Sequence, residues 1–317
     1  TIVGEYSFEA RAREYITSNH KNTKVIIQNA SFIKRIDPDK FTIVFLQDDF
    51  RSMKKPSQTQ ELNLKFADII VTNSIQTSIS YPEYDCKIIP IGIDSKIFKP
   101  LNKNMLRKKY GYSIKDKVGI FVGNFSEVKG WSKVLKSIKH FKDIKWILVT
   151  KYDDDQCNED NVQVHKRVKQ EILAELLNCS DFFIIGSPVE TQCLAALEAN
   201  FCNIPVVMPL VGIYKDFSQH ERKSLGEFND NFITGINNIF KLNYNPRSLL
   251  LKKGMNIEKT IEKWNSLIKI ACKESLIYEL NKQKKYHIDN SLFTLLSKLR
   301  IKFRTFLIRY FFGDFYW

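Results

Sequence analysis

The sequence predicts an α/β protein made of two Rossmann-like, doubly wound domains, each built around a parallel sheet. Short runs rich in β-branched residues alternate with helical stretches, which is the pattern of repeated strand and helix units. This alternation stops near Asp94 to Pro100 and then begins again. The 317 residues, of which 44% are hydrophobic, suffice for two cores.

The first half contains five expected strands and one expected helix. The strand candidates are Ile2-Val3, Lys24 to Gln28, Thr42 to Leu46, Asp68 to Thr72 and Lys87 to Pro90. A helical pattern runs from Phe8 to Asn19. We therefore assign residues 1–97 to a short N-terminal domain.

The second half repeats the pattern with more regular spacing. Its strand candidates are Lys117 to Gly123, Lys145 to Thr150, Asp181 to Ile185 and Pro205 to Met208. Helices are expected to begin at Trp131, Gln170 and Thr191. We assign residues 98–255 to this domain. Ligands of doubly wound sheets bind beyond the carboxyl ends of the strands, so the loops after these strands are the candidate sites.

Two further segments follow. Asn256 to Glu274 is amphipathic, with Trp264 and Leu267 among the apolar residues on one side, and predicts a closing helix over residues 256–275. Residues 276–317 form a basic, aromatic tail. From Ser291 to Trp317 the tail has five basic residues, one acidic residue and nine aromatic residues.

The tail has the composition of an interfacial helix, in which basic residues face anionic headgroups and aromatic residues occupy the boundary layer. We expect it to hold the protein on an anionic membrane surface. Two alternatives remain open: a helix packed on the protein's own core, and binding of single-stranded nucleic acid.

The charge balance of the chain favours a polyanionic partner. The 49 Lys and Arg residues exceed the 35 Asp and Glu residues by 14, which suits nucleic acid, an anionic membrane or a phosphorylated small molecule. The six cysteines have no CxxC pairs and indicate thiols of a reducing compartment. The N-terminus lacks the features of a signal peptide. We therefore expect a cytoplasmic protein, peripheral on the inner face of the membrane.

Three stretches carry motifs. They are residues 87–100 (KIIPIGIDSKIFKP), residues 118–130 (VGIFVGNFSEVKG) and residues 187–199 (SPVETQCLAALEA), the last followed by IPVV at 204–207. Together they resemble the retaining, nucleotide-sugar-dependent glycosyltransferases of family 4, also described as glycosyl transferases group 1. The resemblance implies the GT-B fold, with a nucleotide-sugar cleft between its two domains.

The third stretch places two carboxylates near a helix N-terminus. With a helix from Thr191, free N–H groups near Thr191, Gln192 and Cys193 would suit a phosphate. Glu198 would lie about 80° round the helix from Glu190. The resemblance implies that Glu190 contacts the donor sugar and that Glu198, expected on the solvent side, holds the ribose hydroxyls.

The second stretch supplies a cation. The resemblance implies that Lys129 binds the diphosphate, and its charge can offset the negative charge that grows on the leaving nucleotide. Gly123 and Gly130 flank this loop. Asn124 stands where the family has an Arg, and the loss of that charge is expected to weaken diphosphate binding.

Two donor-side or acceptor-side candidates lie in the first domain. Gln47 follows a strand, where many family members have a His; an amide can contact a sugar hydroxyl but cannot exchange protons as His does. Gly4 occupies the place of a glycine-rich turn that faces the donor phosphates in the family. The first domain is shorter than is typical of the family, so the acceptor is the part that the sequence describes least.

The sequence thus predicts a retaining, hexosyltransferase-like enzyme that uses a nucleotide-diphosphate sugar as co-substrate. The expected acceptor is a lipid-linked or envelope glycan. No metal or other cofactor is expected, because the five His residues have no metal-ligand spacing. The alternatives are a catalytically weak GT-B-like protein that serves as a membrane-bound scaffold and, less favoured, a nucleic-acid-binding or DNA-modifying protein.

Overall fold

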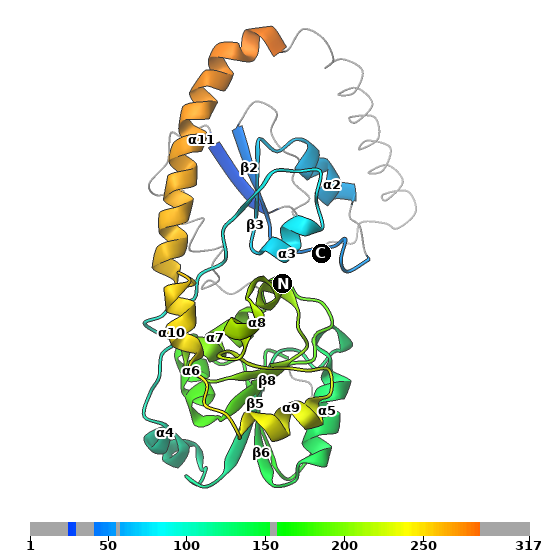
Figure 1. Ribbon diagram of the computed structural model, residues 1–317, viewed down its shortest axis with the longest axis vertical. Helices are drawn as coiled ribbons and strands as arrows, with labels where there is room; N and C mark the ends of the chain where they lie inside the picture. The colour runs from blue at the N-terminus through cyan, green and yellow to red at the C-terminus, as the bar shows by residue number, and fades with distance from the viewer. Residues whose placement is uncertain (1–24, 30–40, 55–57, 153–156, 286–317) are drawn as a thin grey trace, which may run out of the picture. The chain divides into compact units, whose positions relative to one another are not determined.

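The structure is a computed structural model that describes residues 25–29, 41–54, 58–152 and 157–285 (Figure 1). It contains two parallel β-sheets. The expected first strand and first helix, Gly4 and the tail from Ser291 lie outside the described residues.

Within the described residues, the first sheet has four parallel strands in the order β1-β2-β3-β4. They are β1 (Val25–Asn29), β2 (Phe41–Leu46), β3 (Ile69–Thr72) and β4 (Cys86–Ile88). All six residues of β2 are buried, as expected of an inner parallel strand. Ile43 pairs with Ile69 in the register of β2 and β3. The described strands follow the chain order, so this part of the sheet contains no switch point.

The second sheet has six parallel strands in the order β10-β9-β8-β5-β6-β7. They are β5 (Lys117–Val122), β6 (Ile144–Thr150), β7 (Val162–Lys166), β8 (Phe182–Ile184), β9 (Val206–Met208) and β10 (Gly226–Phe228). The chain direction across the sheet reverses between β5 and β8, so this domain is doubly wound, as predicted. In such a sheet the carboxyl edge beside the switch point is where ligands bind.

The helices among the described residues of the first domain are α2 (Gln58–Lys65) and α3 (Ile75–Ile79). Those of the second are α4 (Lys103–Tyr110), α5 (Trp131–His140), α6 (Gln170–Cys179), α7 (Leu194–Phe201), α8 (Gln219–Arg222), α9 (Phe232–Ile239) and α10 (Pro246–Lys252), with short 3-10 helices η1 (Glu127–Lys129) and η2 (Gly212–Asp216). Four of these helices pack in a row, with α4 on α6, α6 on α7 and α7 on α10. Separately, α5 packs on α9.

The predicted strands within the described residues are all present, with ends shifted by one or two residues. The edge strands β7 and β10 are absent from the prediction. The β10 strand is three residues long and starts at a glycine, and β7 (VQVHK) is only partly buried. Neither has the continuous apolar run that marks a buried strand, because an edge strand is covered on fewer sides.

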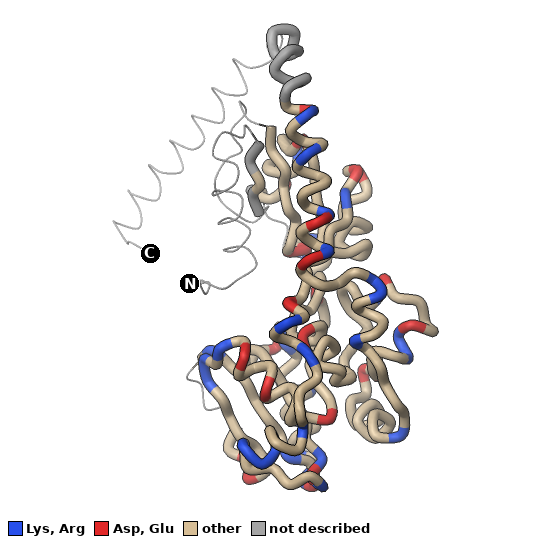
Figure 2. The backbone as a smooth tube through the Cα atoms, turned by 90° about the vertical axis from the view of Figure 1, so that its left-hand side faces the viewer, with Lys and Arg blue, Asp and Glu red and all other residues tan. Residues whose placement is uncertain are grey.

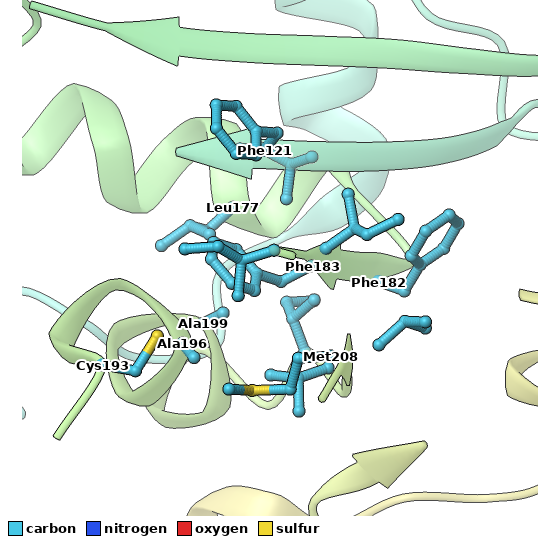
Figure 3. Packing of buried hydrophobic residues seen from close by; sticks show 14 of the residues in the cluster. Phe121, Leu177, Phe182, Phe183, Cys193, Ala196, Ala199 and Met208 are labelled. Carbon is cyan, nitrogen blue, oxygen red and sulfur yellow. The ribbon is translucent and has the colours of Figure 1, made fainter. Parts of the chain in front are cut away.

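The main core lies in the second domain (Figure 3), where Phe121, Leu177, Phe182 and Phe183 are fully buried. Gly119 in β5 makes room for two large rings. A Cβ atom there would lie 2.7 Å from both the Trp146 and the Phe182 ring. These two rings meet edge to face with centroids 5.6 Å apart, so the glycine is required by packing.

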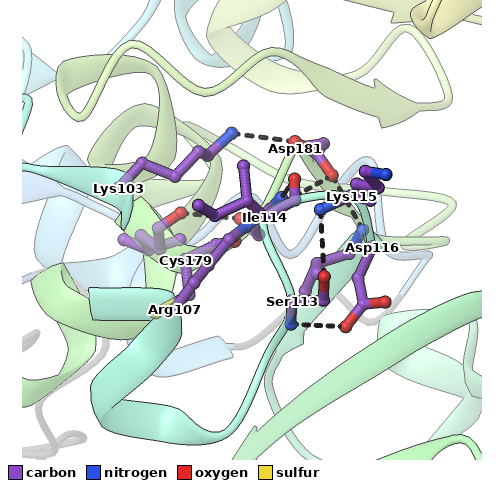
Figure 4. A network of polar contacts seen from close by, with 11 residues as sticks. Lys103, Arg107, Ser113, Ile114, Lys115, Asp116, Cys179 and Asp181 are labelled. Carbon is purple, nitrogen blue, oxygen red and sulfur yellow. Dashed lines mark hydrogen bonds and ion pairs between the residues drawn. The ribbon is translucent and has the colours of Figure 1, made fainter. Parts of the chain in front are cut away.

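A polar network holds α4 against the amino-terminal ends of β5 and β8 (Figure 4). One carboxylate oxygen of Asp181 accepts hydrogen bonds from the backbone N–H of Val118 and from Arg107, each 2.8 Å long, and the other pairs with Lys103 at 2.8 Å. Arg107 is buried and also donates to the carbonyls of Cys179 and Ile114. This network lies at the edge of the sheet opposite to the candidate site and is structural.

The last helix, α11 (Ile257–Lys285), begins beside the interdomain linker, where the N–H of Ile257 donates to the carbonyl of Ile93 over 3.0 Å. It is longer than the predicted closing helix. By its contacts the chain also divides into a large unit, which includes both sheets, and a small C-terminal unit. The boundary between these units lies inside α11, between Ile268 and Lys269. Basic and acidic residues mix along its described part (Figure 2). Among the described residues, no helix is both long and apolar enough to cross a membrane.

The six cysteines are free thiols. Four of them, Cys157, Cys179, Cys193 and Cys202, are buried, and the other two are half-buried.

Candidate active site at the carboxyl edge of the second sheet

Two loops touch at the carboxyl edge of the second sheet. One follows β5 and carries Lys129 and Gly130; the other follows β8 and begins at Gly186. The N–H of Gly186 donates to the carbonyl of Lys129 over 3.1 Å. A Cβ atom at Gly130, whose φ is +63°, would lie 2.1 Å from the carbonyl oxygen of Gly186. Only glycine allows this approach, which sets Lys129 beside the loop that contains Glu190.

Lys129 and Glu190, both predicted as catalytic, form an ion pair. The Lys129 Nζ atom lies 2.6 Å from Glu190 Oε1, and the two side chains are 32% and 13% exposed. Burial on its own would lower the pKa of Lys129, but the neighbouring Glu190 carboxylate holds that pKa above its usual value. Lys129 is therefore charged, partly desolvated and still reachable from solvent, which are properties suited to binding a diphosphate.

Helix α7 begins at Leu194, and not at Thr191 as predicted. The preceding residue, Cys193, has φ +61° and ψ 67°, a left-handed conformation that ends helical geometry at this point. Thr191, Gln192 and Cys193 therefore belong to the loop, and the expectation that they supply the first free N–H groups of the helix is wrong. The Cys193 side chain packs in the core beside Ala196 (Figure 3).

Gln192 is buried and holds the interdomain linker. Its side-chain Oε1 accepts the N–H of Ile91 over 2.9 Å, and its Nε2 donates to the carbonyl of Ile91 over 2.6 Å. The amide thus pairs with Ile91 as a neighbouring strand would. The observed role of the Gln192 side chain is therefore to hold the linker.

The geometry argued for the two carboxylates is also wrong, because Glu190 precedes α7 and shares no helix with Glu198. Glu198 lies inside α7 and is half-buried. Desolvation raises its pKa to about 8, so it is not the solvent-side carboxylate that we expected. Near neutral pH this side chain is largely protonated and can donate a hydrogen bond.

The remaining predicted residues lie around the pair in different ways. A Cβ atom at Gly123 would lie 3.5 Å from Lys129 Cγ, so this glycine lies beneath the lysine stem. Asn124 is half-buried in the same loop, where its carbonyl accepts the N–H of Ser126. Gln47 is half-buried at the end of β2, in the first domain.

Three residues at this edge were not predicted. Gly212, with φ +56°, packs so closely that its Cβ atom would lie 3.0 Å from the carbonyl oxygens of Glu190 and Thr191. Asp216 and Asn73 make hydrogen bonds between the two domains, to Ile75 and Thr191 respectively. The sequence signal available for Asn73 was a polar residue directly after a buried strand; Gln47 has the same position after its strand but was singled out by the family resemblance. Among the described residues, no cluster of three or more His, Cys, Asp or Glu side chains could hold a metal ion.

Sequence comparison places this site in a family. Residues 102–256 match the family model described as Glycosyl transferases group 1, which confirms the predicted resemblance to that group over this segment. Over 150 residues, or 44% of this chain, the sequence is 29% identical to N-acetyl-alpha-D-glucosaminyl L-malate synthase of Bacillus anthracis. The match spans 39% of the length of that relative.

Solved structures show the fold. Sucrose-phosphate synthase of Thermosynechococcus elongatus matches 82% of this chain and 76% of its own, with a TM-score of 0.63 and 16% identity. Anabaena HepE in complex with UDP-glucose matches 73% of this chain and 72% of its own, with a TM-score of 0.59 and 17% identity. The fold is GT-B, as predicted.

Proposed function

We propose that the protein is a retaining glycosyltransferase of family 4 that moves a sugar from a nucleotide-diphosphate donor to an acceptor. The observation that carries this proposal is the Lys129–Glu190 ion pair of 2.6 Å. It lies at the carboxyl edge of a doubly wound sheet, where such sheets bind nucleotides. The family match of residues 102–256 includes both residues.

The proposed roles follow from charge. A diphosphate competes with Glu190 for the Lys129 ammonium group, and Lys129 then stabilises the charge that grows on the leaving nucleotide. Glu190, released from the pair, is free to accept hydrogen bonds from sugar hydroxyls. Glu198 is proposed to hold the ribose, and Gln47 to contact the acceptor. We propose that transfer needs no metal ion, so EDTA should leave the rate unchanged.

A thermal-shift panel of nucleotides and nucleotide sugars tests the proposal. UDP and UDP-glucose are the first probes, because the Anabaena structure contains UDP-glucose. A ligand present at 100 times its Kd should stabilise the fold by about 2.7 kcal/mol. Lys129→Ala should reduce the shift caused by UDP, while Lys133→Ala on the exposed side of α5 should not. Absence of a shift with every nucleotide and nucleotide sugar would reject the proposal.

We further propose that the acceptor is a lipid-linked or envelope glycan at a membrane surface. This rests on the composition of Ser291 to Trp317, with its five basic and nine aromatic residues. Truncation after Asn290 should abolish co-sedimentation with anionic vesicles and leave UDP binding unchanged, and neutral vesicles serve as the control. If the tail packs on the core instead, the truncated protein will melt at a lower temperature and the full chain will ignore vesicles.

A second candidate is a catalytically weak scaffold of the same fold. Asn124 favours it, since an amide replaces the cation that the family resemblance implies beside Lys129. Donor turnover separates the candidates: a scaffold would bind UDP and leave UDP-sugars intact. Asn124→Arg should raise turnover if the missing charge limits catalysis.

A further inference from the structure

Asn73 connects the two domains beside the candidate site. It directly follows β3, is 1% exposed and has a carboxamide with two N–H groups. Its Nδ2 donates to the backbone carbonyl of Gln47 over 3.3 Å and to Thr191 Oγ1 over 3.1 Å. Its Oδ1 accepts from Thr77 Oγ1 over 3.1 Å. The Thr77 hydroxyl thus determines the amide orientation, so that both N–H groups are directed at Gln47 and Thr191.

A second contact next to Asn73 joins the same elements. The Asp216 carboxylate in η2 accepts the backbone N–H groups of Ile75 and Gln76, at 2.8 and 3.2 Å. These are the first two residues of α3, where free N–H groups favour a negative charge. The loop between β3 and α3 is therefore held to the second domain at two points, one by a neutral amide and one by a carboxylate.

Both partners of Asn73 lie next to residues that the proposed mechanism uses. Gln47 is the proposed acceptor contact, and Thr191 directly follows Glu190. Transfer between two bound molecules is sensitive to small errors in their relative position. One buried side chain that is hydrogen-bonded to both the acceptor segment at Gln47 and the donor loop at Thr191 can limit such errors.

We propose that Asn73 is a positioning residue for sugar transfer, which holds the end of β2 at Gln47 in register with the donor loop at Thr191. This inference rests on the function proposed above. Asn73 need not touch either substrate. It acts through the backbone of Gln47 and the hydroxyl of Thr191, and Asp216 keeps the same loop in place.

The test compares Asn73→Asp with Gln60→Glu. Gln60 is a matched control because it is a buried amide of the same domain that donates to the carbonyl of Asp48 over 3.0 Å and accepts from Tyr81 over 2.8 Å. It differs in that none of these partners belongs to the second domain. Both substitutions replace a buried amide by an acid, so a general loss of stability should affect both.

Asn73→Asp should lower the rate of UDP release from UDP-glucose at least tenfold and change the Kd for UDP by less than twofold. Hydrogen exchange at Ile75 and Gln76 should accelerate in Asn73→Asp and stay unchanged in Gln60→Glu. Thr191→Val removes the same link from the other side, so the double variant should turn over no more slowly than the slower single variant.

Additive losses in the double variant, or equal losses in Asn73→Asp and Gln60→Glu, would reject the positioning role. If the unsubstituted protein binds no nucleotide and turns over no nucleotide sugar, the proposed function itself fails. Unchanged turnover in Asn73→Asp, with UDP binding and turnover intact in the unsubstituted protein, would reject the inference about Asn73 alone.

Discussion

Three ionisable side chains of the candidate site differ in their charge and hydrogen bonding because of their surroundings. Lys129 and Glu190 neutralise each other across 2.6 Å, and a diphosphate would have to replace the carboxylate at the lysine. Glu198 has its pKa raised to about 8 by desolvation. A charged pair and a protonated acid are therefore present at neutral pH, although the sequence shows two similar glutamates eight positions apart.

Lys129→Ala is expected to slow sugar transfer more than it weakens donor binding. The charge on the diphosphate grows as the glycosidic bond breaks, so the lost cation matters most in the transition state. Removing one such electrostatic contact typically costs about 100-fold or more in kcat. Steady-state kinetics with the donor found in the thermal-shift panel measure the effect. An unchanged kcat in Lys129→Ala would show that Lys129 has no role in sugar transfer.

Glu198→Gln should change how stability depends on pH. The folded pKa of about 8 lies above the model value of 4.5, so the folded state holds this proton more tightly than the unfolded chain does. The contribution of Glu198 to stability is then present below about pH 4.5 and is lost as the pH rises towards 8. Urea unfolding between pH 5 and 8 should show a decline that Glu198→Gln reduces and that Glu171→Gln, on the exposed side of α6, does not.

At the scale of elements, the site depends on two loops whose backbones nearly touch at Gly130 and Gly186. Their contact results from the parallel sheet, which brings the carboxyl ends of β5 and β8 side by side. Each strand was predictable, but the approach of the two loops is not visible in either motif alone. The position of Lys129 relative to Glu190 therefore depends on the sheet and on the two glycines, Gly130 and Gly186, which allow the loops to approach.

Gly130→Ala should destabilise the protein and weaken UDP binding. Gly111→Ala is the matched control, since Gly111 also has a left-handed φ, +80°, but no atom within 4 Å of the added Cβ. The control should cost only the conformational term, about 1 kcal/mol. Gly130→Ala adds a clash with Gly186, about 1 to 3 kcal/mol more. Urea unfolding measures both losses of stability. Equal losses would show that the two loops can move apart without lowering the free energy of unfolding.

At the scale of the whole molecule, the linker between the domains is held by hydrogen bonds from α10 and α11. The Thr260 hydroxyl in α11 donates to the carbonyl of Pro90. The Arg247 guanidinium in α10 donates to the carbonyls of Ser95 and Phe98. Arg247 also donates to the carbonyl of Phe201 at the end of α7. The helix that carries Glu198 is therefore coupled to the linker.

Gln192→Met should destabilise the protein by about 2 to 4 kcal/mol, because it leaves the buried N–H and carbonyl of Ile91 without partners. Gln163→Met is the control, since Gln163 accepts one exposed hydrogen bond from Tyr112 and should change stability by less than about 0.5 kcal/mol. Chemical unfolding measures both. A Gln192→Met protein as stable as the control would show that the linker does not need this amide.

The sequence by itself determined the strands of the second domain's inner sheet and singled out Lys129 and Glu190, but not the ion pair between them. Strands such as β2 and β6 were readable because each contains a continuous apolar run, residues 43–46 (IVFL) and 146–149 (WILV), and local composition encodes burial. Lys129 and Glu190 were singled out because their motifs resemble those of the glycosyltransferase family and follow two such strands. Only the tertiary structure decided where α7 starts, what Gln192 binds and that Asn73 meets Thr191. The Asn73–Thr191 hydrogen bond joins residues 118 positions apart, and such a contact depends on how the two domains pack, which no local pattern in either segment specifies.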